Sequence, residues 1–114
     1  MTIDVVARAF YRLVNQRWTG RGNGVRVRAR DVQEVICKQT DLYNETLCRS
    51  RSWIVFTELQ RLMNVLCRLC TVLVICDNRP RVRTREYFIK LDCINLIKSL
   101  DEDDFVKLIK SFMS

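Results

Sequence analysis

Residues 72–91 read VLVICDNRPRVRTREYFIKL, and this stretch decides the fold. Val72–Ile75 is a β-branched and aliphatic run of strand length, and Asp77–Pro80 ends it with strong turn-forming residues. Glu86–Leu91 is again rich in aromatic and β-branched side chains, which favours a returning strand. Four arginines lie at or beside the turn: Arg79, Arg81, Arg83 and Arg85. The stretch therefore predicts a β-hairpin with a strongly cationic tip.

The segment that opens the chain predicts a helix and then a strand. Apolar residues recur at spacings of three and four over residues 3–14, which is typical of an amphipathic helix, and we expect it to end near Trp18. Three glycines then mark a loop. Val25–Ala29 alternates apolar and basic residues, so we expect a short strand with one apolar and one cationic face.

A second helix is expected directly after this strand. Asp31 is followed three residues later by Glu34, which resembles a capping box, and an apolar stripe at helical spacing follows. The end of this helix stays open. It either continues to Leu47 or breaks around Thr40, because Asp, Asn and Thr compete with helical backbone hydrogen bonds.

A third helix is expected from about Trp53, where Ser50 or Ser52 can cap its first turn. Apolar residues at helical spacing form one side of it. The opposite side is polar and cationic, and consists of Thr57, Gln60, Arg61, Asn64 and Arg68. Such a helix can present its polar side to DNA.

The last part of the chain differs from the rest in charge. Residues 1–91 contain 17 Lys and Arg against 8 Asp and Glu, a balance of +9, whereas residues 92–114 contain 3 against 5, a balance of −2. An apolar helical face in this tail is predicted to mediate dimerisation, although it can equally pack on the core of its own chain. This face consists of Ile97, Leu100, Phe105, Leu108, Ile109 and Phe112.

The expected elements in order are helix, short strand, helix, helix, strand, basic turn, strand and helical tail. This order resembles the winged helix-turn-helix family over roughly residues 3–91. The stretches that carry the resemblance are Arg30–Ile36, Arg51–Leu62 and Arg83–Phe88. The chain departs from the family pattern because its second helix or the following turn is longer and contains no glycine. We expect an α+β, mainly α fold, with a winged-helix-like basic domain over 1–91 and a helical tail over 92–114.

The resemblance implies that the third helix lies in the major groove and that the hairpin, as the wing, contacts the backbone or the minor groove. The implied groove residues are Arg49, Ser50, Arg51, Thr57, Gln60 and Arg61, and the implied wing residues are Arg79, Arg81, Arg83 and Arg85. Arginine can bridge guanine edges and can also contact phosphates. The predicted function is a regulator of transcription or replication that binds double-stranded DNA, with or without sequence specificity.

A small protein-interaction adaptor, of viral or mobile-element origin, is the alternative. RNA binding ranks third, because only Tyr87 and Phe88 are placed to act as aromatic platforms on a sheet.

Catalysis is not expected, because the chain contains no histidine and no phosphate loop, nucleophile elbow or dinucleotide fingerprint. We also expect no metal, cofactor, small-molecule substrate or membrane contact. The most apolar stretch, Val65–Cys76, is too short to span a bilayer and is expected in the core. No export signal is readable, so we expect an intracellular protein, in the cytoplasm or nucleus, with reduced thiols. The cysteines are Cys37, Cys48, Cys67, Cys70, Cys76 and Cys93.

Overall fold

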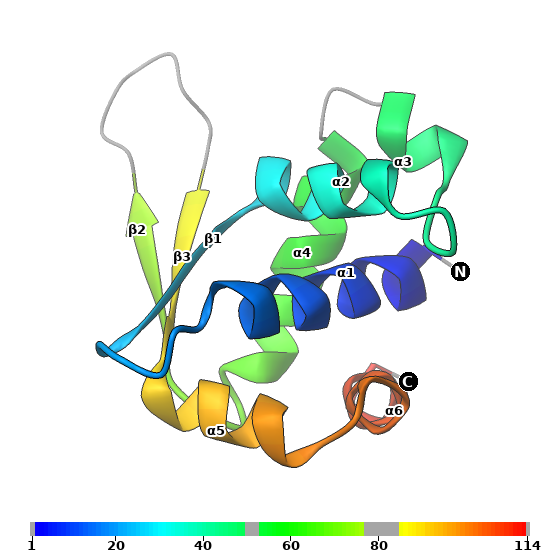
Figure 1. The fold of residues 1–114 in the computed structure, drawn as a ribbon. Coiled ribbons are helices and arrows are strands. Elements are labelled where there is room, and N and C mark those ends of the chain that lie inside the picture. The colour runs from blue at the N-terminus through cyan, green and yellow to red at the C-terminus, as the bar shows by residue number, and fades with distance from the viewer. Residues whose placement is uncertain (1, 50–52, 77–84, 114) are drawn as a thin grey trace.

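The computed structural model describes residues 2–49, 53–76 and 85–113, which form a mainly helical α+β fold (Figure 1). The elements are α1 Thr2–Arg17, β1 Gly24–Arg28, α2 Ala29–Lys38, α3 Glu45–Arg49, α4 Trp53–Leu66, β2 Val72–Cys76, β3 Arg85–Lys90, α5 Leu91–Ser99 and α6 Glu102–Ser111. The predicted fold class, mainly α with a small antiparallel sheet, is confirmed. The strands of the predicted hairpin are also present.

The sheet has the strand order β1-β3-β2, and both strand pairs are antiparallel. Val25 lies opposite Ile89 and Val27 lies opposite Tyr87; all four side chains are buried. This face of the sheet is turned towards the helices, as Figure 1 shows. Because successive side chains of a strand alternate between faces, Arg26 lies on the opposite, outer face. The alternation predicted for β1 is therefore confirmed.

Strand β2 forms an edge of this sheet and is less buried than its composition suggests. Leu73 is 48% exposed and Val74 is 52% exposed, although neighbouring strand residues point to opposite faces. The prediction that Val65–Cys76 is core holds for Val65 and Leu66, but it is wrong for the exposed residues Cys67, Arg68, Thr71, Leu73 and Val74. The other edge strand, β1, packs against α1 and α2, whereas β2 packs mainly against β3, so side chains on both faces of β2 remain partly open to solvent.

A glycine is required at the start of β1. A Cβ atom at Gly24 would collide with the carbonyl oxygen of Ile89 and would lie 2.9 Å from the ring of Phe88. The Phe88 ring thus occupies the space that a side chain would need. The ammonium group of Lys90 lies 5.8 Å from the centroid of this ring, within the range of a cation–π contact.

The second helix begins earlier than its capping pattern predicts. Strand β1 leads directly into α2, and the carboxylate of Asp31 accepts a hydrogen bond from the Arg28 amide at 3.0 Å. Asp31 therefore lies within the first turn, and the predicted start at Asp31 is wrong. Helix α2 ends at Lys38, and α3 is a separate short helix, so the chain breaks between them.

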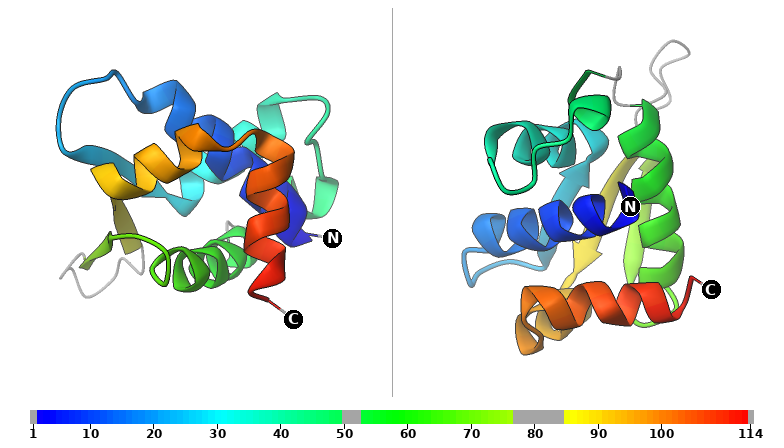
Figure 2. Two further views of the ribbon diagram at one scale, coloured as in Figure 1. Left: turned by 90° about the horizontal axis from the view of Figure 1, so that it is seen from below. Right: turned by 90° about the vertical axis from the view of Figure 1, so that its right-hand side faces the viewer.

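The C-terminal tail packs against α1 and shares its core. The Phe105 ring lies 6.0 Å from that of Phe10 and 5.6 Å from that of Tyr11, measured between centroids. The Tyr11 hydroxyl donates a hydrogen bond of 2.6 Å to the Leu100 carbonyl. Figure 2 shows α6 running alongside the first half of α1, which places both chain ends on the same side.

This packing corrects the predicted dimer face. Ile97, Phe105 and Ile109 are 0% exposed within a single chain, so assigning them to an intermolecular surface is wrong. Leu100 and Leu108 are half-buried, and Phe112 is 40% exposed. The apolar spacing that suggested dimerisation instead reflects attachment of the tail to its own chain.

Candidate nucleic-acid interface

Several predicted binding segments lie at one end of the molecule. Figures 1 and 2 show α3, the first turn of α4, the end of β2 and the start of β3 at this end, and α5 and α6 at the opposite end. We call the first of these the α3 end. The antiparallel pairing of β2 with β3, which sets Cys76 opposite Arg85, brings the two strand termini together there.

Helix α4 has one buried and one exposed side, as its sequence predicts. Val55, Leu59, Leu62 and Leu66 are 0% exposed. Trp53, Thr57, Arg61 and Asn64 are exposed, and their spacing of four, four and three residues places them on one face. We call these four residues the α4 stripe. Gln60, beside it, is half-buried, and Arg68 is exposed in the turn that follows the helix.

Arg61 is the cation of the α4 stripe. Its guanidinium donates hydrogen bonds of 3.0 and 3.3 Å to the two carboxylate oxygens of Glu58, which is the only acidic residue in α4. The Arg61 side chain is 52% exposed, whereas that of Glu58 is 10% exposed. Both hydrogen bonds come from a single nitrogen, Nη1, so the other N–H groups of the half-exposed guanidinium can contact a phosphate while the pair with the largely buried Glu58 stays intact.

Arg49 ends α3 and is a strongly exposed member of the predicted groove residues. Its side chain is 80% exposed and forms an ion pair of 2.9 Å with Glu45, four residues earlier on the same helix. Both side chains are well exposed, so the pair is screened by solvent and leaves Arg49 available to an anionic partner.

Helix α3 is short, and its position depends on anchors to the rest of the fold. Leu47 is 0% exposed, and its carbonyl accepts a hydrogen bond of 2.7 Å from the Gln33 side chain. The Asn44 side chain accepts a hydrogen bond of 3.1 Å from the Leu47 amide. A disulfide joins Cys37 of α2 to Cys48 of α3. These contacts determine where Arg49 lies.

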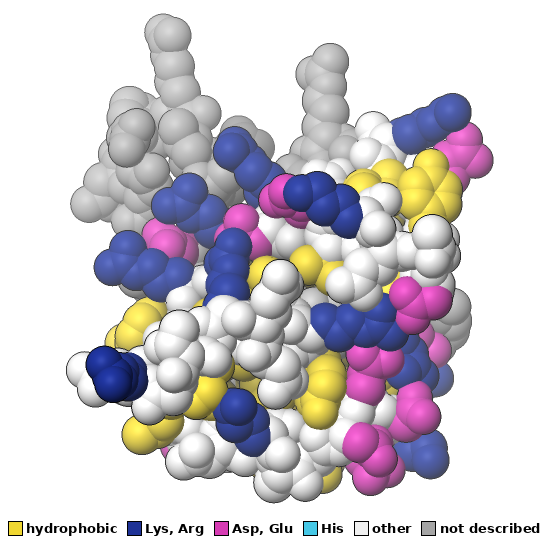
Figure 3. All heavy atoms as spheres, viewed as in Figure 1, with side chains coloured by type: hydrophobic (Ala, Val, Ile, Leu, Met, Phe, Trp, Pro, Cys, Tyr) yellow, Lys and Arg dark blue, Asp and Glu magenta, His cyan; other side chains and the backbone are white. Residues whose placement is uncertain are grey.

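A second basic region lies on the outer face of β1 and was missing from the predicted site. Arg26 and Arg28 have side chains that are 68% and 55% exposed, and they lie 3.9 and 3.4 Å from the same Glu86 carboxylate. Arg30 follows them and is exposed in the first turn of α2. Figure 3 shows Lys and Arg side chains gathered over this part of the molecule. The alternation of Val and Arg in residues 25–28 is the sequence signal that identifies it.

A charged network fixes the segment that leads into α3. The Arg12 guanidinium donates to both carboxylate oxygens of Asp41, at 3.0 and 2.7 Å, and to the Glu102 carboxylate at 2.5 and 3.1 Å. It also hydrogen bonds to the Gln39 side chain. Hydrogen bonds from Arg12 lower the pKa of Asp41 and also that of Glu102, for which Arg8 adds a smaller effect. The network joins α1, α6 and the α2–α3 connection, and its carboxylates are held ionised as structural groups.

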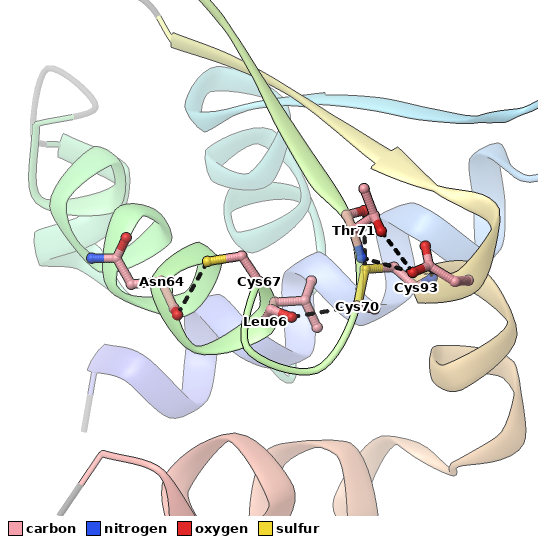
Figure 4. The surroundings of a disulfide bond; sticks show 7 residues. Asn64, Leu66, Cys67, Cys70, Thr71 and Cys93 are labelled. Atoms are coloured by element: carbon pink, nitrogen blue, oxygen red, sulfur yellow. Dashed lines mark hydrogen bonds between the residues drawn. A yellow bond between two sulfur atoms is a disulfide. The ribbon is translucent and has the colours of Figure 1, made fainter.

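Four cysteines form disulfides, so the prediction of reduced thiols is wrong for them. Besides the bridge between α2 and α3, a second disulfide joins Cys70, after α4, to Cys93 in α5 (Figure 4). Cys67 is exposed as a free thiol and donates to the Asn64 carbonyl at 3.4 Å. The spacing of the cysteines did not indicate these pairings, because the partners meet only in the folded chain.

A hydrogen-bonded junction accompanies the second disulfide. The Asp92 carboxylate accepts hydrogen bonds of 2.9 Å from both the amide and the hydroxyl of Thr71. Desolvation works against the charged form of Asp92, but the bonds from Thr71 outweigh it and lower the pKa of this carboxyl group. The start of β2 and the start of α5 are thus held together.

The remaining predicted site residues fall in other parts of the chain. Ser50, Arg51, Arg79, Arg81 and Arg83 lie outside the described residues. Arg85 is the first residue of β3, and its side chain also lies outside the described part.

Other kinds of site find little support in the residues that the structure describes. A hollow of about 350 Å³ between α1 and α2 is lined by oppositely charged pairs, among them Arg17 with Asp31 and Lys38 with Glu34. Within residues 2–49, 53–76 and 85–113, no group of three or more His, Cys, Asp or Glu side chains could hold a metal ion. The same residues include no helix with the length and apolarity needed to cross a membrane. Comparisons with protein-family models, curated proteins and solved structures found no match to this chain.

Proposed function

We propose that this chain is a regulator of transcription or replication that binds double-stranded DNA, with α4 in the major groove and the β2–β3 hairpin as a wing. The observation that carries the proposal is the exposed α4 stripe on a helix whose first turn lies at the same end of the molecule as the end of β2 and the start of β3. The order of elements up to β3, and the sheet order β1-β3-β2, support a winged-helix architecture.

Charge supports a phosphate-bearing partner. The net charge is +7, and Arg26 and Arg28 share the single Glu86 carboxylate, so the basic region on the outer face of β1 keeps an excess of positive charge. Clustered basic side chains attract the DNA backbone and release counterions when it binds. We propose no catalytic role for the hollow between α1 and α2, because its charged side chains are held in ion pairs, Arg17 with Asp31 and Lys38 with Glu34.

Salt dependence of binding to a mixed-sequence duplex tests the proposal. We expect a steep loss of affinity with rising salt and weaker binding to single-stranded DNA or RNA of equal length. Replacing Arg49 and Arg61 with alanine should reduce the magnitude of the log–log slope by about two, since each phosphate that an arginine neutralises adds roughly one to that slope. The matched control removes two exposed lysines at the opposite end, Lys98 and Lys107. Equal effects of the two double variants, or no duplex binding at low salt, would reject the proposal.

The wing needs a separate test, because most of its arginines lie outside the described residues. Alanine at Arg81, Arg83 and Arg85 should weaken binding to all duplex sequences alike, as expected for backbone contacts. Alanine at Arg51 or Arg61 should instead change which sequences are preferred. Unchanged affinity and unchanged preference in both sets would contradict the wing and groove assignments.

A protein-interaction adaptor is the second candidate, and the exposed aromatic residues favour it. Tyr43 is 57% exposed and Trp53 is 71% exposed, and Arg49 ends the helix between them. Trp, Tyr and Arg are the residues that most often dominate protein interfaces. Stoichiometric recovery of one protein partner that persists after nuclease treatment would support this function, whereas loss of the partner with nuclease would reject it.

A further inference from the structure

Trp53 is the most exposed large hydrophobic side chain among the described residues, at 71% of its surface. It is the first residue of α4, a helix of 14 residues whose apolar side is already buried. An aromatic side chain can bury about 150–250 Å² in a contact, and most of this area is unused here. Single exposed apolar residues are common. Trp53, however, lies on the α4 stripe, so a partner that contacts this helix face would also contact the indole ring.

The beginning of the α4 stripe offers mostly apolar surface. The Thr57 hydroxyl donates a hydrogen bond of 3.1 Å to the Trp53 carbonyl, one turn earlier, so its proton is already used within the helix. The indole ring and the Thr57 methyl group remain as contact surface. Arg61 follows one turn later on the same face; its Nη1 is paired with the buried Glu58, and its side chain is 52% exposed.

This arrangement suits one feature of B-form DNA. The edges of the bases in the major groove present hydrogen-bonding groups, except at thymine, whose C5-methyl group is apolar. The net charge of +7 and the single, buried acidic residue of α4 favour an anionic duplex over an apolar protein groove. We infer that Trp53 and Thr57 contact thymine methyl groups and make the protein selective for thymine-containing sites. This inference rests on the proposed function.

The test begins with selection of bound duplexes from a library of random sequence, using the oxidised full-length protein. The enriched duplexes are then synthesised with thymine or with uracil, which removes the methyl group and keeps every pairing edge. We expect binding of the native protein to weaken about fourfold for each contacted methyl group that is removed. Trp53→Ala should lose the part of the difference that the indole ring supplies, and the double variant Trp53→Ala/Thr57→Ser should bind both duplexes alike. Trp53→Phe should retain part of the Trp53 contribution.

The controls separate this inference from the proposed function. Phe112→Ala removes another exposed aromatic side chain, 40% exposed, at the opposite end of the molecule, and should leave the preference for thymine intact. Because both side chains are exposed, thermal unfolding of each variant should match the native protein. Duplex binding without enriched sequences, or with equal affinity for thymine and uracil, would overturn the inference and leave the proposed function standing. Absence of any duplex binding at low salt would overturn both.

Discussion

The two disulfides allow a quantitative prediction about stability. They close segments with sequence separations of 11 for Cys37 and Cys48 and 23 for Cys70 and Cys93. In the chain-entropy treatment, closing loops of these lengths stabilises the folded state by about 2.8 and about 3.4 kcal/mol at 25 °C. Reduction of both bonds should therefore remove about 6 kcal/mol, which is a large part of the 5–15 kcal/mol typical of a native domain.

The contribution of each bond to stability can be measured by comparing the oxidised and reduced forms of one and the same variant. A background with Cys67→Ser and Cys76→Ser removes from exchange the two cysteines that form neither of these bonds. In this background, replacing Cys37 and Cys48 with alanine leaves the Cys70–Cys93 bond, and urea unfolding with and without reductant should differ by about 3.4 kcal/mol. The reciprocal variant, without Cys70 and Cys93, should show about 2.8 kcal/mol.

Two outcomes would refute this reasoning. Alkylation of the unfolded but unreduced protein, followed by peptide mass spectrometry, should leave the four bonded cysteines unmodified. Modification at Cys70 or Cys93 would show that the second bond does not form. A difference below about 1 kcal/mol between oxidised and reduced protein would show that loop closure is not what the bonds contribute.

Three further predictions concern the core, the sheet and pH. Phe105→Ala should lower the free energy of unfolding by about 3–5 kcal/mol and leave the oligomeric state unchanged in sedimentation. If Phe105 were a dimer contact, the substitution would instead change the oligomeric state and leave the stability of the single chain nearly unchanged. Gly24→Ala should cost about 1–3 kcal/mol in urea unfolding, because its Cβ would collide with the Ile89 carbonyl; native stability would contradict that geometry. Glu102 has a lowered pKa because of hydrogen bonds first from Arg12, so it stabilises the fold above its ordinary pKa and loses this contribution as acid protonates it. In urea unfolding, the free energy of unfolding of Glu102→Gln should fall less between pH 6 and pH 3 than that of the native protein. An equal fall in both proteins would count against this role of Glu102.

Local patterns in the sequence predicted much of the fold. The helical spacing of residues 3–14, the alternation of residues 25–28 and the β-branched run Val72–Ile75 each specify an element through its own period. The start of α2 could not be predicted this way, because Asp31 fits a cap as well as a position inside the first turn. Only the direct passage of β1 into α2 distinguishes the two.

Long-range contacts account for what the sequence could not reveal. The spacing of the apolar face that contains Phe105 fits a dimer surface and a core contact equally well. The contact that distinguishes the two is with Phe10 in α1, some 95 residues earlier in the chain. The disulfide partners likewise meet only after folding. The polar side of α4 was predicted correctly, but nothing in its spacing indicated that Trp53 would stay exposed.

The junction at Thr71 and Asp92 has a consequence for how this chain can change. The bond between Cys70 and Cys93 closes a ring that contains the whole β2–β3 hairpin, and the Lys90 amide adds a hydrogen bond of 3.1 Å to the Thr71 carbonyl at its base. Lengthening a loop whose ends are already held costs little, about 0.6 kcal/mol for each doubling. Insertions and replacements between Cys76 and Arg85 can thus accumulate without disturbing the helices. The hairpin is a position where recognition can diverge, or be redesigned, independently of folding.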